Sequence, residues 1–146
     1  MTVVGIGIDL VDRAGFAAQL SDVASDFAGA TFAASERRAV AQAPVTTPEA
    51  TRLAARFAAK EAFIKAWSVA RFGRAPALHV VDPREIVVVS DDFGRPRLEL
   101  RGAVADAVAE LAAETGAITI HLSLTHDGPT AGAVVVLDAE EVGPMA

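Results

Sequence analysis

The chain has 146 residues, a length that suits one domain over residues 1–146. It contains no cysteine, which excludes disulfide cross-links and thiolate metal sites. The formal net charge of -6 argues against nucleic-acid binding by general basic attraction, and no apolar run approaches the ~20 residues of a membrane span, so we expect a cytoplasmic protein that binds neither nucleic acid nor membrane.

The N-terminal third is predicted to hold one strand and several short helices. Val3–Ile8 is apolar enough for a buried strand, with Asp9 at its carboxyl end. Residues 11–27 carry apolar side chains at helical intervals, interrupted by a glycine and a serine, which predicts one or two short helices. Ser35 is predicted to cap another short helix that ends at Val40.

The middle of the chain predicts one long helix. Thr47, Pro48 and Glu49 supply a capping hydroxyl, a proline at the first position and an acid near the positive end of the helix dipole. Strong helix formers continue to Phe72, and Gly73 is a stop signal. A helix of about 25 residues is roughly 37 Å long and would form the spine of the fold.

The next segment predicts a hairpin and a helix. Ile86–Val89 and Arg97–Leu100 are predicted strands, joined through a turn-rich connection at residues 91–96. Ala103–Thr115 is a predicted helix that ends at a glycine.

Two further strands complete the fold. Residues 118–125 alternate apolar and polar side chains, which predicts a strand with one buried face. A turn at residues 127–129 leads into the returning strand Ala131–Leu137, and residues 140–146 are expected to form a loose tail. The order of elements predicts an α+β fold in which a mainly antiparallel sheet packs around one long central helix.

Charge is spread unevenly along the chain. Residues 49–74 contain six bases and two acids, a balance of +4 that leaves -10 for the remainder. A basic segment in an acidic protein suggests a local anion site, and a phosphate-rich small molecule would fit it. The alternative is an ordinary solvated helix face.

The first candidate site segment is Gly5-Ile6-Gly7-Ile8-Asp9. Its acid follows a buried strand and lies beside flexible backbone, so it can face a ligand while the strand is held rigid. Alternatively, the glycines only permit close packing and Asp9 only caps the next helix. The segment also resembles the first phosphate loop of sugar kinases, whose two-lobed architecture does not fit in 146 residues.

The second candidate segment lies in the long helix. Glu61 and Lys65 are four residues apart and share a face with apolar side chains. The simplest alternative is an exposed ion pair worth a few tenths of a kcal/mol. The apolar neighbours predict instead that Glu61 is partly buried, which costs several kcal/mol unless the carboxylate is paired or binds a metal.

The third candidate segment is the strand end from His121 to Gly128. A histidine near an Asp-Gly turn can serve as an acid, a base or a phosphate contact, although such a histidine is more often structural. Ser123 and His121 also suggest a nucleophile and its base, but no nucleophile elbow surrounds the serine.

Together these segments resemble the holo-[acyl-carrier-protein] synthase family of 4'-phosphopantetheinyl transferases. The opening GIGIDLV, the helical ARFAAKEAFIKA and the late IHLSLTHDG occur in that family's order and spacing. The GRPRL segment that starts at Gly94 also fits. The resemblance runs nearly from end to end.

The resemblance implies transfer of the 4'-phosphopantetheine arm of coenzyme A to a serine of an acyl carrier protein, or of a carrier domain, with release of 3',5'-ADP for fatty-acid synthesis. Asp9 and Glu61 would bind Mg²⁺ together with the pyrophosphate of coenzyme A, and Lys65 would offset phosphate charge. The serine proton would go to Glu61 or to a metal-bound water. The implied catalytic residues are Asp9, Glu61, Lys65 and His126.

The resemblance also implies a site shared between subunits of a homotrimer. His126 would approach from a neighbouring subunit, Arg56 and Lys60 would contact the phosphates, and the turn of Gly94, Arg95 and Pro96 would lie near the nucleotide. A hydrophobic content of 52% agrees with subunit association.

One position departs from the family pattern. Members that modify free acidic carrier proteins usually have an arginine six residues after the first aspartate, and here that position is Gly15. From Asp9 to Phe32 the only base is Arg13, against four aspartates, although Arg37 and Arg38 follow. We therefore expect a less acidic acceptor, such as a carrier domain of a large synthase.

Two other functions fit the same residues. A different Mg²⁺-dependent enzyme acting on a nucleotide or a pyrophosphate would reuse Asp9, Glu61 and Lys65. A non-catalytic assembly module would use Glu61 and Lys65 only as a structural ion pair.

Overall fold

The computed structural model describes residues 1–141 and 143. Three long strands form an antiparallel sheet in the order β1 (Thr2–Asp12), β5 (Thr130–Ala139) and β4 (Ile118–Asp127). A separate hairpin of β2 (Ile86–Ser90) and β3 (Pro96–Leu100) follows a 3₁₀ turn, η1 (Pro83–Glu85). The helices are α1 (Arg13–Ser21), α2 (Phe27–Thr31), α3 (Ala34–Gln42), α4 (Glu49–Ala70) and α5 (Gly102–Thr115).

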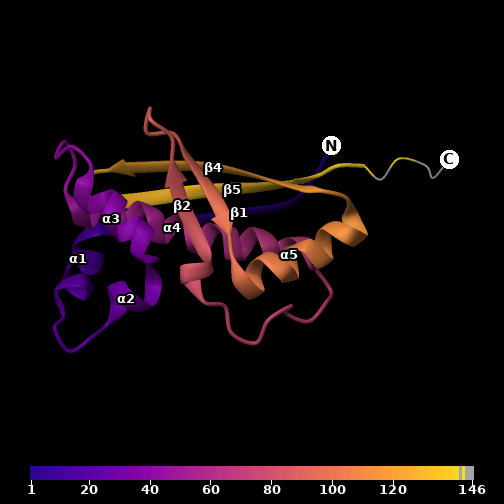
Figure 1. Ribbon diagram of the computed structural model, residues 1–146, viewed down its shortest axis with the longest axis horizontal. Coiled ribbons are helices and arrows are strands. Elements are labelled where there is room, and N and C mark those ends of the chain that lie inside the picture. Colours follow the sequence, from indigo (N-terminus) through magenta and orange to yellow (C-terminus); the bar gives the residue numbers. More distant parts are fainter. Residues whose placement is uncertain (142, 144–146) are drawn as a thin grey trace.

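The helices divide between the two ends of the sheet. Figure 1 shows α1, α2 and α3 gathered at one end, α5 at the other, and the hairpin tip projecting beyond the long strands. The long helix α4 forms the spine, and its alanines at positions 54, 58, 59, 62 and 66 are completely buried. The predicted α+β fold, with a mainly antiparallel sheet around one long helix, is confirmed.

The strand β1 lies directly on α4 because two of its residues have no side chain. A Cβ on Gly5 would overlap the carbonyl of Ala66, and one on Gly7 would overlap the carbonyl of Ala62. Backbone can approach backbone this closely only at glycine. The two glycines therefore set the depth at which the next inward residue of β1, Asp9, meets the helix.

Most predicted elements are present, with shifted ends. The long helix ends at Ala70 rather than Phe72, and its cap position is Pro48 rather than Thr47. Ser35 does not cap α3 but lies inside it, because α3 starts one residue earlier at Ala34. The alternation along β4 is confirmed, with its apolar side chains half-buried.

The first strand extends further than the sequence predicts. Asp9 is not at the end of its strand, because β1 keeps its ladder with β5 as far as the pair Asp12–Thr130. The tail predicted at residues 140–146 lies largely outside the described residues. Within the described part of the chain, no helix has the length and apolar character needed to cross a bilayer.

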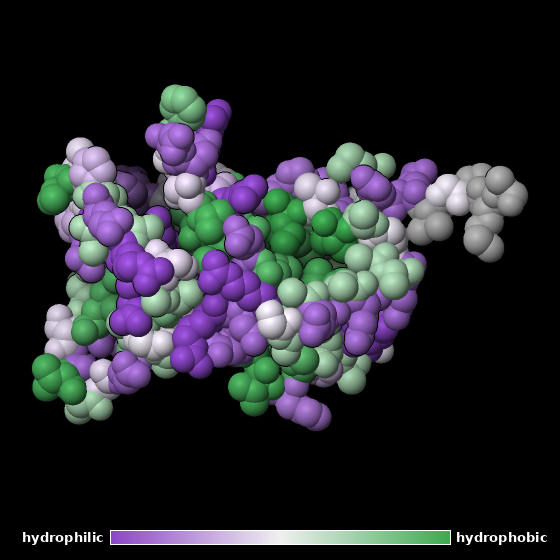
Figure 2. Space-filling view, in the orientation of Figure 1, coloured by the Kyte–Doolittle hydropathy of each residue, from purple (hydrophilic) through white to green (hydrophobic). Residues whose placement is uncertain are grey.

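The part of the sheet face that points away from α4 along β1 is apolar and is not covered by any other described residues. Along β1, the outward side chains of Ile6, Ile8 and Leu10 are 56–69% exposed, and Val134 of β5 is 36% exposed. Apolar side chains also gather on the face drawn in Figure 2, between the projecting hairpin and α5. Uncovered apolar surface of this kind marks an interaction site.

Candidate active site

The first strand and the long helix meet at an ion pair. Lys65 Nζ donates to Asp9 Oδ1 at 2.9 Å and to the carbonyl oxygen of Ile8 at 3.0 Å. The Asp9 side chain is only 15% exposed, whereas that of Lys65 is 53% exposed. The carboxylate is therefore fixed against the helix, and the ammonium group stays within reach of a ligand in solvent.

Glu61 lies one helical turn before Lys65 and is half-buried, as the sequence predicts. Burial raises the pKa of its carboxyl group, the negative charge of Asp9 raises the pKa further, and the charge of Lys65 partly opposes both effects. Two carboxylates and one ammonium group are thus close enough to influence one another. Sites that shift a pKa by burial and by a like charge are frequently functional.

The two carboxylates fit a hard divalent cation. Mg²⁺ binds few protein carboxylates and completes its octahedron with water and substrate phosphates. Among the described residues no group of three or more acids and histidines could hold a metal. Asp9 and Glu61 would therefore supply two ligands and leave the remaining positions open, and a cation there would relieve the repulsion between them.

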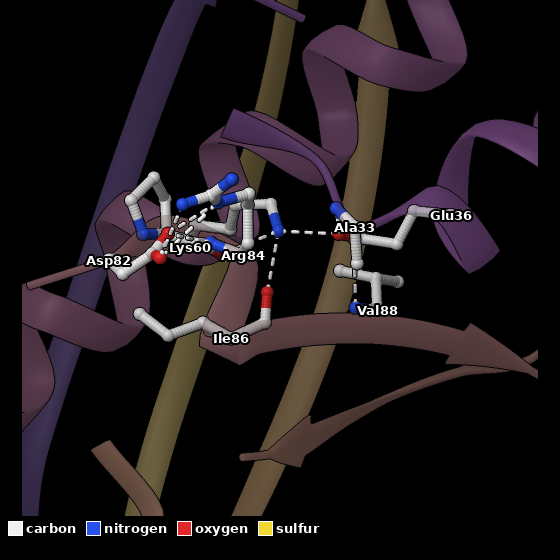
Figure 3. A network of polar contacts seen from close by, with 8 residues as sticks. Ala33, Glu36, Lys60, Asp82, Arg84, Ile86 and Val88 are labelled. Carbon is white, nitrogen blue, oxygen red and sulfur yellow. Dashed lines mark hydrogen bonds and ion pairs between the residues drawn. The ribbon is translucent and has the colours of Figure 1, made fainter. Parts of the chain in front are cut away.

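The structure contradicts the predicted phosphate contact of Lys60. Its side chain is completely buried, and Nζ donates to Glu36 Oε1 at 2.6 Å and to the carbonyl oxygens of Pro83 at 2.9 Å and Ile86 at 2.6 Å. Figure 3 shows Lys60 directed toward α3 and β2. Because all three protons have partners in the core, no donor remains for a phosphate, and that prediction is wrong.

The carboxylate of Glu36 completes this network. Its Oε1 also accepts the N–H of Ala33, and its Oε2 accepts the N–H of Val88, each at 3.0 Å (Figure 3). The burial of Lys60 lowers the pKa of its ammonium group, and the charge of Glu36 opposes this shift. The pair is structural: it ties α3, α4 and β2 together around the residue that precedes Glu61.

Arg56 is on the other side of α4. Arg56 is five positions before Glu61, which is roughly 140° around a helix with 3.6 residues per turn. Its guanidinium is half-buried, donating from one Nη to the carbonyl oxygen of Arg52 at 3.3 Å, while Nε is buried with no hydrogen-bond partner in the described chain. One chain therefore does not bring Arg56 and Glu61 to the same ligand.

The remaining candidate residues are on the hairpin and at the end of β4. Gly94 and Arg95 lie in the exposed connection between β2 and β3, and Pro96 is the half-buried first residue of β3. Arg95 Nε donates to Asp91 Oδ2 at 2.6 Å. His126 is exposed near the end of β4, opposite Ala131. Among the described residues, no hydrogen bond or ion pair joins these four to Asp9, Glu61 or Lys65. Of the predicted site residues, the structure thus brings together Asp9, Glu61 and Lys65.

The other histidine of β4 is already paired. His121 Nε2 lies 2.7 Å from Asp138 Oδ2 on the outward face of the sheet. No hydrogen bond between described residues links it to Ser123.

Sequence analysis missed a cavity between the C-terminal half of α4 and the segment that follows it. It has a volume of about 250 Å³ and is lined by Ile64, Trp67 and Ser68 of α4 and by Leu78 and Val81 of the following segment, among others. Ile64 and Ser68 each lie three residues after a site residue, Glu61 and Lys65, so the cavity is on the neighbouring part of α4. The helical spacing of Glu61, Lys65 and Ser68 was the available signal, but the segment after α4 has no recognisable pattern.

The comparison with known families decides between the alternatives. The model of the 4'-phosphopantetheinyl transferase superfamily matches residues 5–126. The chain belongs to this superfamily. A member named holo-[acyl-carrier-protein] synthase from Mycobacterium tuberculosis H37Rv is 47% identical over 139 residues, which cover 95% of this chain and 99% of that protein. The protein of the same name from Mycobacterium marinum is 46% identical over 138 residues.

Solved structures of the superfamily have the same fold. The Chronobacterium ammoniagenes ACPS-CoA complex superposes with a TM-score of 0.82 at 40% identity and covers 97% of this chain and 100% of the other. The Neisseria meningitidis holo-[acyl-carrier-protein] synthase gives a TM-score of 0.70 at 28% identity and covers 94% and 99%. The match thus extends over nearly the whole transferase chain.

Proposed function

We propose that this transferase is a holo-[acyl-carrier-protein] synthase. It moves the 4'-phosphopantetheine arm of coenzyme A to a serine of an acyl carrier protein or carrier domain in the cytoplasm, for fatty-acid synthesis, and 3',5'-ADP leaves. The observation that carries the proposal is the convergence of Asp9, Glu61 and Lys65 from two elements next to an open cavity.

The chain's own residues account for each part of the transfer. Asp9 and Glu61 would hold Mg²⁺, which supplies charge neutralisation at the pyrophosphate when bound. Lys65 neutralises a phosphate oxygen through its exposed ammonium group. The cavity lined by Ile64 and Trp67 is suited to the pantetheine arm, because its apolar walls match the methyl groups and methylenes of that chain.

The bond changes follow from this arrangement. The serine oxygen bonds to the phosphorus that carries the arm, the bond from that phosphorus to the bridging oxygen breaks, and 3',5'-ADP departs with the bridging oxygen. Among the chain's own residues, Glu61 would accept the serine proton. Lys65 offsets charge on the phosphate oxygens while the binding groups align the attack.

The site is completed by a neighbouring subunit in a homotrimer. Arg56 lies across α4 from Glu61, so a coenzyme bound at Glu61 would reach an arginine at that position only on another copy of the chain. The same copy would bring His126 and the turn of Gly94, Arg95 and Pro96. The uncovered apolar face of β1 and β5 supports such an assembly.

The acceptor is less acidic than a typical free carrier protein. Arg13, the only base between Asp9 and Phe32, is already engaged: it donates to Thr51 Oγ1 at 2.6 and 3.1 Å and to the carbonyl oxygen of Gly128 at 2.6 Å. This region therefore offers little attraction to an acidic helix. Transfer to a free carrier protein and to an excised carrier domain should be compared across salt concentrations. A steep, salt-sensitive preference for the acidic free protein would refute this part.

One assay tests the proposed function. The protein is incubated with coenzyme A, Mg²⁺ and an unmodified carrier protein, and the carrier is weighed by mass spectrometry. We expect its mass to rise by one phosphopantetheine group, located on serine. Hydrolysis of coenzyme A without transfer would favour another nucleotide enzyme, and complete inertness would favour an assembly module.

A further inference from the structure

Arg13 joins two parts of the chain that are far apart in the sequence. Its half-buried side chain donates from Nε and one Nη to Thr51 Oγ1, at 3.1 and 2.6 Å, and from the other Nη to the carbonyl oxygen of Gly128 at 2.6 Å. Its backbone N–H donates to the carbonyl oxygen of Pro129 at 2.8 Å. Thr51 is buried in the first turn of α4, and Gly128 and Pro129 form the turn between β4 and β5.

The β4–β5 turn depends on Arg13 for its polar link to the long helix. The turn lies at the end of the sheet where α1 begins (Figure 1), and the ladder between β1 and β5 ends at the pair Asp12–Thr130. Among the described residues, no hydrogen bond joins the turn directly to α4. A planar guanidinium holds its donors in a fixed fork, so it can bind two acceptors that lie in different directions. Arg13 therefore acts as a clamp between the turn and the start of α4.

Both clamped parts carry a residue that the proposed function assigns to a neighbouring subunit's site. Arg56 is five positions after Thr51, which is roughly 7.5 Å along the helix axis. His126 is two positions before Gly128. One chain would thus offer both side chains to the coenzyme that its neighbour holds. Their relative placement matters, because a shift of about 1 Å in a binding group can lower a rate on the order of 100-fold.

We propose that Arg13 is a positioning residue, which holds Arg56 and His126 in the relative placement that the neighbouring subunit's site requires. This inference rests on the proposed function and on its homotrimer. Arg13 contacts neither substrate and acts through α4 and the β4–β5 turn. The competing explanation is an effect within the same chain, because Arg13 follows Asp9 by four positions and a loosened end of β1 would displace that carboxylate.

Two variants open the clamp from its two sides. Arg13→Met removes the donors, and Thr51→Val removes the acceptor on α4 while the charge of Arg13 remains. We expect each to raise the KM for coenzyme A by about threefold to tenfold and to leave kcat within about twofold of the wild type, because binding groups are displaced. Arg101→Met, which breaks an exposed pair with Glu99, is the control and should leave KM unchanged. A KM within about twofold of the wild type in either clamp variant would overturn the proposal.

Mixed trimers test whether Arg13 acts on the neighbouring site. Tagged Arg13→Met chains are coexpressed with a large excess of untagged Glu61→Gln chains, whose own site is inactive but whose Arg13 is intact, and the trimers are purified by the tag. Each tagged chain then has neighbours that supply correctly placed Arg56 and His126. We expect the KM for coenzyme A to return to within about twofold of that of tagged wild-type chains in the same mixture. A KM that stays raised would overturn the proposal and assign the effect to Asp9 of the same chain.

The proposed function can fail separately from this inference. If the wild type transfers the arm but sediments as a monomer, only the positioning role falls, because no neighbouring site exists. If the wild type transfers nothing, the affinity for coenzyme A is measured by titration calorimetry in the wild type and in both clamp variants. A loss of about threefold to tenfold in both variants supports the positioning role. Equal affinity in the three proteins, or binding of coenzyme A by none of them, overturns it.

Discussion

Lys65 Nζ and Asp9 Oδ1, 56 positions apart in the sequence, are 2.9 Å apart in the structure. Their contact depends on the residue two positions before Asp9. Gly7 lets β1 lie against the carbonyl of Ala62, one residue after Glu61. A packing feature of the backbone thus determines where the carboxylates of the site meet, which links the fold to the proposed chemistry.

This link predicts the effect of Gly7→Ala. The added methyl group overlaps backbone that cannot move without separating β1 from α4, so we expect destabilisation of about 1–3 kcal/mol. Transfer should fall more than the folded fraction does, because Asp9 is displaced. Denaturant unfolding and the transfer rate measure the two effects. In the control Gly15→Ala, the nearest neighbour is the flexible Asp12 carboxylate, and little change is expected.

The raised pKa of Glu61 gives a pH-dependent prediction. The folded protein binds this proton more tightly than the unfolded chain, so stability falls as the pH rises from the ordinary value of 4.5 through the raised pKa. Glu61→Gln removes this loss. We expect it to be at least as stable as the wild type at about pH 8 and indistinguishable at about pH 4.

The stability of Glu61→Gln and of the wild type is compared by thermal unfolding at both pH values, with and without Mg²⁺. Transfer by Glu61→Gln should fall on the order of 100-fold or more. If Glu61→Gln were clearly less stable than the wild type at the higher pH, Glu61 would be a stabilising residue rather than a strained site carboxylate.

The buried pair of Lys60 and Glu36 predicts a purely structural effect. Lys60→Met leaves the Glu36 charge and two carbonyl oxygens without their partner, so unfolding should become easier by about 3–5 kcal/mol. The KM for coenzyme A of the fraction that folds should stay within about twofold. Arg74→Met, which breaks an exposed pair with Glu114, should leave the unfolding midpoint nearly unchanged. A large rise in KM would restore Lys60 as a phosphate contact.

The apolar outer face of the sheet predicts the behaviour of Ile8→Lys. Ile8 is 61% exposed in one chain, and a charge there would be buried on association. We expect the wild type to sediment as a trimer, and the variant as a folded monomer that transfers poorly. Val23→Lys, at a fully exposed position outside the sheet, should stay trimeric. A wild type that sediments as a monomer would exclude the shared site.

Local signals predicted most of the fold. The long helix has helix formers throughout and the hairpin has a turn-rich connection, so both were recognisable within a short window. Asp9 was placed at a strand end because it interrupts the apolar run of Val3–Ile8. Its pairing with β5 depends on residues more than 100 positions away.

The site was only partly predictable for the same reason. Glu61 and Lys65 share a helical face, which spacing alone reveals. Lys60 was misassigned because its partner Glu36 is 24 positions away and belongs to another helix.

The most direct test of the central claim is calorimetric titration of coenzyme A into the wild type and the double variant Asp9→Asn/Glu61→Gln, each with and without Mg²⁺. The two carboxylates are proposed to hold one divalent ion with the pyrophosphate. We therefore expect Mg²⁺ to tighten binding to the wild type by at least about tenfold and to leave the double variant unchanged. Equal tightening by Mg²⁺ in both proteins would contradict the assignment.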